Sequence, residues 1–334
     1  MLDLAALELD AERRKLARLL AVEAESLHYV DALAAADIRQ LRHTVEAHIF
    51  DRGAKRFRGL AKSTKLLPNK VNALIAQRAL GPRLAAQVAG LLEPKTAVAL
   101  ADQVSLEFRA DLCGYLDPRR AGDVLRAMPL EIVLQTSAEL VRRGDHMTMA
   151  RFVDDLKPEQ IAAVAAEIDA VSMLWTGFYV ESAQSLAQLI GMLDDQQIIG
   201  TIHAAANEEL WPQSLALMLR VDETTTARMV ALLAQQPPAV SASLLRYADA
   251  VDGWSVLAQL LQRADPADQQ RLRDMHAEAS PDWVRHIDEA AYTLQHCYPL
   301  RAQADLANGV DEISVPSLKR SLYADAHPSV GREW

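Results

Sequence analysis

The side chains that most often act as bases, nucleophiles or metal ligands are thinly spread along this chain. His43 and His48 are five positions apart and would face different sides of a helix, whereas His48 and Asp51 are three apart and can meet on one face. His296 and Cys297 are adjacent, and adjacent helical residues point about 100° apart. We therefore predict no catalytic residues, no metal site and no cofactor, and we interpret His48 and Asp51 as a surface pair.

Adjacent carboxylates are a second source of acid–base or metal chemistry. Such pairs divide acid and base roles only where burial separates their pKa values. Here they fall at expected helix ends or loops, so we expect capping or solvation, with a magnesium site as the alternative. The pairs of two identical acids are Asp154-Asp155, Asp194-Asp195 and Glu208-Glu209.

An aromatic cluster stands out because only 5% of the residues are aromatic. Trp175, Phe178 and Tyr179 follow i, i+3, i+4 spacing, which places them on one face of a helix, and Gly177 between them permits close approach of another helix. We expect them to form a well-packed core position. The alternative is a pocket or partner groove, because helical arrays present concave surfaces and the polar tips of Trp175 and Tyr179 need partners.

The strongest local anomaly in charge is a basic stretch between Asp51 and Lys70. The expected role is a solvated face that pairs with the acidic remainder of the chain. The alternative is an anion patch for a phosphate-bearing ligand, an anionic lipid headgroup or nucleic acid, although Phe57 is its only aromatic residue and gives no stacking platform. The residues of this possible patch are Arg52, Lys55, Arg56, Arg58, Lys62 and Lys65.

The composition excludes several classes of protein. A net charge of −10 and an isoelectric point near 5.4 make nucleic acid an unlikely partner. No run approaches the roughly 18 apolar residues of a membrane span, and the N-terminus does not resemble a secretory signal. Cys113 and Cys297 are far apart, and we interpret them as free buried thiols. We therefore expect a cytoplasmic protein. Phosphate-binding glycine loops, a nucleophile elbow and paired zinc cysteines are absent from the sequence.

The elements that must position these residues are helices. A recurring phrase of an apolar residue, a polar residue and proline opens amphipathic runs, and proline belongs in the first turn of a helix. Sustained alternation of apolar and polar residues is absent from the sequence, so we predict an all-α fold. Pro118 and Pro158 are 40 residues apart, which fits one helix pair of an α-solenoid. The phrase occurs at Leu92-Glu93-Pro94, Leu116-Asp117-Pro118, Leu156-Lys157-Pro158 and, in degenerate form, Ala264-Asp265-Pro266.

The chain divides into three segments by its patterning. Residues 1–65 form an N-terminal helical segment with the basic stretch, residues 66–303 form the helical array, and residues 304–334 form a tail. We expect one amphipathic helix over residues 3–31 that packs on its own domain, with a homodimer through this helix as the alternative. A second helix is expected over residues 36–50.

The segment from Leu116 to Pro129 resembles the superhelical repeat in the N-terminal cytoplasmic domain of MgtE-type magnesium transporters, which flagellar motor switch proteins share in outline. Pro118 and Pro129 match the spacing of its two helix starts, and the resemblance extends over about residues 90–235. It implies a right-handed superhelix of helix pairs with an interaction surface. The transport activity of that family does not carry over, because this sequence has no counterpart of its membrane domain.

From these observations we predict a non-catalytic interaction or scaffold protein that holds a protein partner on a superhelical surface. A small-molecule or divalent-ion sensor with a pocket near Trp175 and Tyr179 is the alternative. An enzyme is the second alternative.

Overall fold

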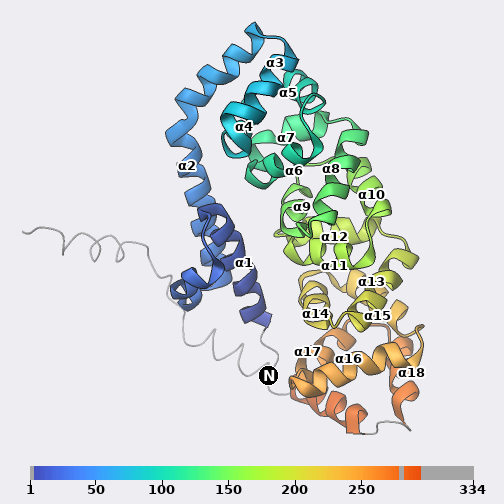
Figure 1. The fold of residues 1–334 in the computed structure, drawn as a ribbon. Coiled ribbons are helices and arrows are strands. Elements are labelled where there is room, and N and C mark those ends of the chain that lie inside the picture. The colour runs from blue at the N-terminus through green and yellow to red at the C-terminus, as the bar shows by residue number, and fades with distance from the viewer. Residues whose placement is uncertain (1–3, 278–281, 295–334) are drawn as a thin grey trace, which may run out of the picture.

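The computed structural model describes residues 4–277 and 282–294, and within these residues every regular element is a helix (Figure 1). The all-α prediction is therefore confirmed. The tail predicted over residues 304–334 lies outside the described residues, as does Cys297.

The chain begins with an arm of three helical elements, α1 (Leu4–Leu20), the 3₁₀ helix η1 (Ala24–Ala32) and α2 (Ala35–Ser63). The single helix expected over residues 3–31 is wrong. Ala21 adopts a left-handed φ of 57°, and the N–H of Val22 returns to the carbonyl of Ala17, which ends α1 in the manner of a left-handed C-terminal cap. Glycine is the usual residue in this conformation and alanine is uncommon there. The sequence has alanine at this position, so it gives no local signal for the end of the helix.

The second helix is longer than expected. α2 continues through most of the basic stretch to Ser63, and Lys65 lies in the short 3₁₀ helix η2 (Thr64–Leu66) that follows. No proline interrupts these residues, and lysine, arginine and alanine are good helix formers. The basic side chains therefore lie on a helix and not on a loop.

The remaining helices form the body. Several begin at the predicted prolines, as α5, α7, α10 and α18 do, and Asp117 caps α7 by accepting a hydrogen bond from the N–H of Arg119. The elements are α3 (Asn69–Ile75), the π-helical segment η3 (Ala76–Leu80), α4 (Gly81–Ala89), α5 (Pro94–Ala101), α6 (Leu106–Tyr115), α7 (Pro118–Ala127), α8 (Leu130–Arg142), α9 (His146–Phe152), α10 (Pro158–Glu167), α11 (Ala170–Tyr179), α12 (Ala183–Met192), α13 (Asp195–Asn207), α14 (Trp211–Arg220), α15 (Glu223–Leu233), α16 (Pro238–Ala250), α17 (Trp254–Gln262) and α18 (Pro266–Ala277), then a helix over residues 282–294.

The body is an elongated stack in which helices pack on their second neighbours along the chain. α4 packs on α6, α6 on α8 and α8 on α10, while α5 packs on α7 and α13 on α15. Such short-range packing is what stacked helix pairs produce, because each pair buries its apolar stripes against the next. The handedness of the superhelix stays a prediction.

The arm folds back along the body (Figure 1). α2 packs against α4, α1 packs against α2, and α1 reaches α14 in the middle of the stack. Within α1, Leu16 is only 2% exposed and belongs to an apolar cluster with residues of η1 and α2, whereas Leu20 is 40% exposed. A homodimer through this helix stays a prediction.

A close approach of α14 to α11 is permitted by Gly177. A Cβ built on Gly177 would lie 2.9 Å from Cδ1 of Leu217 and 3.7 Å from Cδ1 of Leu186. Both leucines belong to the largest apolar core cluster, which extends from α9 to the helix over residues 282–294. The close approach that the sequence suggested at this glycine is therefore made by α14.

We expect Gly177→Val to destabilise the fold by about 1–3 kcal/mol, because the added methyl groups must displace Leu217 in a packed interior. The control is Gly191→Ala near the end of α12, where a Cβ meets no atom within 4 Å; alanine there should stabilise the helix by up to about 1 kcal/mol. Urea unfolding followed by circular dichroism measures both. Equal stability of the two variants would contradict this packing.

Candidate functional site

The aromatic cluster on α11 is covered by the chain's own arm. The ring centroids of Trp175, Phe178 and Tyr179 are 5.2–5.9 Å apart. Phe178 forms a small apolar cluster with Ala11 of α1 and Ala216 of α14, and other apolar residues of α1 pack beside them. The surface that the sequence suggested as a pocket or partner groove is thus the place where α1 joins the body.

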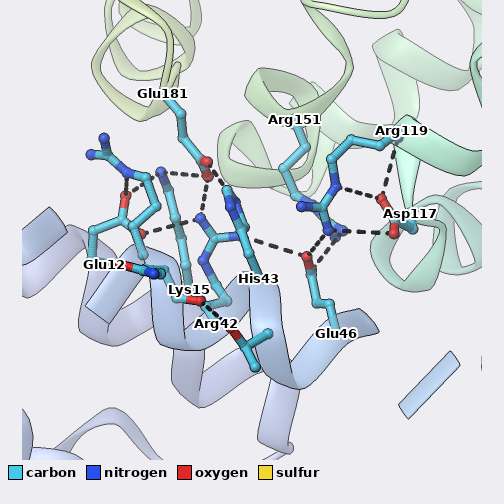
Figure 2. A network of polar contacts seen from close by, with 12 residues as sticks. Glu12, Lys15, Arg42, His43, Glu46, Asp117, Arg119, Arg151 and Glu181 are labelled. Carbon is cyan, nitrogen blue, oxygen red and sulfur yellow. Dashed lines mark hydrogen bonds and ion pairs between the residues drawn. The ribbon is translucent and has the colours of Figure 1, made fainter. Parts of the chain in front are cut away.

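Buried charges surround this junction (Figure 2). Glu12 of α1 is 1% exposed, and its carboxylate accepts hydrogen bonds from Lys15 at 3.0 Å, Arg39 at 3.1 Å and Arg42 at 3.2 Å. Lys15 is 7% exposed and Arg42 is 3% exposed. Because charged groups are stable in such an environment only when they are paired, Glu12 is the counter-ion that allows these cations to be buried.

Glu181, in the break between α11 and α12, connects this charge cluster to the body. Its carboxylate accepts hydrogen bonds from Lys15 at 3.2 Å and Arg42 at 2.5 Å, and it lies 3.2 Å from Nε2 of His43. Lys15 also donates to the carbonyl of Tyr179 at 3.0 Å. We call Glu12, Lys15, Arg42, His43 and Glu181 the clamp, because these residues fasten α1 and α2 to the body (Figure 2).

A second set of ion pairs extends the contact along α2. Glu46 pairs with Arg119 at 2.7 Å and with Arg151 at 3.1 Å (Figure 2). One turn further, Asp51 pairs with Arg120 at 3.4 Å. The expected His48–Asp51 surface pair is replaced by this contact with the body.

The charges of the clamp change the pKa of Glu181. Burial alone would raise this pKa, but the hydrogen bond with His43 and the charges of Lys15 and Arg42 outweigh burial and hold it far below its usual range. Glu181 is therefore a structural anion and not a base that accepts protons near neutral pH.

Serine–histidine contacts occur at two positions in the body. Oγ of Ser172 lies 3.2 Å from Nε2 of His146 and donates to Asp169 at 2.6 Å, so the carboxylate holds the serine and not the imidazole. In a catalytic triad the carboxylate holds the histidine, which in turn accepts the proton of the serine, and the contacts here do not follow that arrangement. Ser241 and His276, which are 2.8 Å apart, are 3% and 5% exposed and have no carboxylate partner among the described residues.

No group of three or more histidine, cysteine, aspartate or glutamate side chains among the described residues could hold a metal ion. Cys113 is a free, half-buried thiol, and burial raises its pKa to about 12, which makes it a poor nucleophile at neutral pH. Of the adjacent carboxylates, Asp194 caps α13, as expected, by accepting a hydrogen bond from the N–H of Gln197.

The basic stretch is solvent-exposed and almost free of ion pairs. Of its six residues, Lys65 alone pairs with a described carboxylate, that of Glu93 at 2.7 Å. The expected pairing with the acidic remainder is therefore limited to this contact. Lys70, Arg78 and Arg83 extend the same charge, so that residues 52–92 contain nine lysines and arginines and no acid.

Apolar side chains protrude from the same region. We call residues 60–84, where α2 ends and η2, α3 and α4 follow, the tip; it lies at one end of the molecule (Figure 1). Among the described residues, seven of the fifteen exposed large apolar side chains belong to the tip, and Leu66 is 83% exposed. They are Leu60, Leu66, Leu67, Val71, Leu74, Ile75 and Leu84.

These apolar residues were missed from the sequence, although a signal was present. Leucine, valine and isoleucine recur among nine cations with no acid between them. The excess of cations is visible in the sequence, whereas the exposure of the apolar residues between them is not. Exposure of apolar residues in one contiguous patch is typical of interaction surfaces.

A cavity of about 250 Å³ begins at the tip and extends between the helices of the body. Leu60, Leu67 and Ile75 line it and are also 39–42% exposed, so the cavity opens at the tip. Its walls are mostly leucine, valine, isoleucine and alanine side chains from α2 to α12. At about 24 cal/mol per Å³, an empty space of this size would cost about 6 kcal/mol, comparable with the whole net stability of a domain.

Comparisons with family models, with curated proteins and with solved structures found no match for this chain. The resemblance to the MgtE-type repeat therefore stays a prediction. None of the described helices is both long enough and apolar enough to cross a membrane.

We expect Glu12→Gln to destabilise the protein by about 3–5 kcal/mol, because it leaves the buried Lys15 and Arg42 short of one counter-charge. Urea unfolding measures the loss, and limited proteolysis of the arm should become faster. The control is Asp123→Asn, which removes an exposed pair with Arg126 and should change stability by less than about 0.5 kcal/mol. A loss below about 1 kcal/mol for Glu12→Gln would contradict the role of the clamp.

The clamp also predicts that the stability of the fold decreases at acidic pH. Because the folded protein lowers the pKa of Glu181 from its ordinary value of 4.5, this carboxylate stabilises the fold fully above that pH and progressively less below it. Glu181→Gln should therefore be less stable than the wild type at pH 7, and the difference in their free energies of unfolding should decrease between pH 5 and pH 3. Urea midpoints at these pH values measure it, and a constant difference would contradict the assignment.

Proposed function

We propose that this chain is a non-catalytic binding protein that docks on an anionic membrane surface through its tip. The observation that carries the proposal is the coincidence, in residues 60–84, of protruding apolar side chains with exposed lysines and arginines, of which Lys65 alone pairs with a described carboxylate. Apolar side chains enter the interfacial region of a bilayer, and each nearby cation adds about 1 kcal/mol of attraction to anionic lipids.

The distribution of charge gives the docking one orientation. Residues 52–92 carry a net charge of +9, while the remainder of the chain holds 26 basic and 45 acidic residues, a net charge of −19. An anionic surface attracts the tip and repels the body. The molecule would therefore stand on its tip, with the body extending away from the surface.

A bilayer fits the tip better than a protein partner does. Helical partners are usually held in a groove, whereas the tip is the end of the molecule (Figure 1), where Leu66 is 83% exposed. Protein interfaces are also depleted of lysine, while cations of a single sign suit a surface of lipid headgroups.

The scaffold interpretation from the sequence placed a protein partner on the superhelical surface. The arm occupies the aromatic face of α11, which was the first position suggested for a groove. If a protein partner is bound, the tip is the surface on which we propose that it binds, because apolar exposure and positive charge coincide there, and its charge complement would be an acidic amphipathic segment.

Co-sedimentation with vesicles tests the proposal. Vesicles that contain 30% phosphatidylserine in phosphatidylcholine should sediment the protein, pure phosphatidylcholine vesicles should bind it at least tenfold more weakly, and 0.5 M salt should release it. Two double variants should each reduce binding at least tenfold, namely Leu66→Asp/Leu74→Asp and Lys62→Glu/Lys70→Glu. Neither lysine forms an ion pair with a described residue, so the lysine variant changes the surface charge without breaking such a pair.

Matched substitutions outside the tip are Leu130→Asp in α8 and Arg246→Glu in α16, which are exposed and should leave binding unchanged. Equal binding to neutral vesicles, or binding that survives both tip variants, would overturn the proposal. Absence of vesicle binding, together with tip-dependent binding of an acidic amphipathic peptide, would replace the membrane with a protein partner.

A further inference from the structure

The cavity that opens at the tip has the lining of a ligand site. Its volume of about 250 Å³ exceeds that of an engineered 150 Å³ apolar cavity that stays dry and binds benzene. Polar side chains in the wall are few, and those of Thr64, Asn72 and Thr136 hydrogen-bond to nearby backbone carbonyls. Such a wall offers water few hydrogen-bond partners, so an apolar occupant is favoured over water in this cavity.

One charged side chain, Arg109 of α6, lines the cavity. It donates to the carbonyl of Ala101 at 3.1 Å and to Oε1 of Gln135 at 3.0 Å, but its Nε is buried and has no hydrogen-bond partner. Arg109 forms no ion pair with any described carboxylate. A cation with a free donor beside an apolar space is poorly compensated, so it favours an anion.

The hydroxyl of Thr176 is a second unpartnered polar atom in the wall. Thr176 lies on α11 and is 5% exposed, and its Oγ1 has no hydrogen-bond partner in the described structure. Buried polar atoms are nearly always hydrogen-bonded in folded proteins. Two such atoms in the wall of one cavity therefore indicate that the cavity accommodates something besides protein.

We propose that this cavity binds a single hydrocarbon chain with an anionic headgroup, with the chain in the apolar interior and the headgroup facing Arg109. A fatty carboxylate and a single-chain phospholipid share this chemistry. Delivery of the chain from a membrane through the opening at Leu60, Leu67 and Ile75 rests on the proposed function, whereas the binding itself does not.

The first experiment measures binding in vesicle-free buffer. The full chain is titrated with the fluorescent fatty acid cis-parinarate, which is then displaced with palmitate below its aggregation concentration. We expect one saturable site. Native mass spectrometry after incubation with palmitate, or separately with lysophosphatidate, identifies which of the two sources of this chemistry the cavity accepts.

Substitutions that fill the cavity separate this site from binding to the exposed tip. Ala97→Leu and Ala165→Leu add volume to the wall in α5 and α10 and should weaken parinarate binding at least tenfold. Ala166→Leu, at the neighbouring exposed position, is the matched control and should bind as the wild type does. Without ligand, the filled variants should melt at the same or a higher temperature than the wild type, which distinguishes filling from unfolding.

Arg109→Gln tests the headgroup. It should weaken palmitate binding about tenfold and leave binding of neutral hexadecanol unchanged, because only the carboxylate loses a partner. The tip variant Leu66→Asp/Leu74→Asp should retain palmitate binding in solution while it loses vesicle binding. Failure of this inference is therefore distinguishable from failure of the membrane proposal.

Three results would overturn the inference. The first is no displaceable binding of parinarate together with no lipid adduct in the mass spectrum. The second is binding that Ala97→Leu and Ala165→Leu leave intact, since it would then occur on the surface. A fall in melting temperature for both filled variants would show a packed interior and would also contradict the cavity.

Discussion

The structure depends on the clamp that fastens the arm to the body. α2 is a long, polar helix with few buried residues, so apolar packing contributes little to its position. The ion pairs of Glu12 and Glu181 with Lys15 and Arg42 supply attachment that apolar packing does not, since removing either carboxylate would leave these buried cations short of one counter-charge. The apolar contact of α1 with Phe178 adds to this attachment.

The position of the arm also determines the tip and the opening of the cavity. Because α2 is held along the body at the clamp and at α4, its C-terminal end meets η2, α3 and α4 and forms the tip. Leu60 and Ser63 of α2 line the cavity, so the arm supplies part of the wall near the opening. The clamp, the tip and the opening of the cavity are thus parts of one arrangement, in which an acidic body presents a basic and apolar end.

Much of the fold could be predicted from the sequence because its signals are local. Pro94, Pro118 and Pro158 begin helices since proline is favoured in a first turn and disfavoured later, whatever the tertiary structure. The break at Ala21 was missed because tertiary contacts place an alanine where glycine is the usual signal. The clamp could not be predicted either, since Glu12 and Glu181 are 169 positions apart and nothing in either neighbourhood indicates the other.

The candidate site was predicted in part. The cations of the basic stretch were identified, whereas the exposure of Leu66 and Leu74 depends on how α3 sits at the end of the stack. Periodicity marks an apolar face but does not say whether another element covers it. The same limit applies to the aromatic cluster, because its spacing indicated a packed face without identifying α1 as the element that covers it.

Hydrogen–deuterium exchange with and without anionic vesicles tests the central claim most directly, because it locates the contact on the wild-type chain. Docking through the tip predicts slower exchange in residues 60–84 and unchanged exchange in α13–α17. Protection confined to the body, or no protection at a lipid concentration that sediments the protein, would contradict the account.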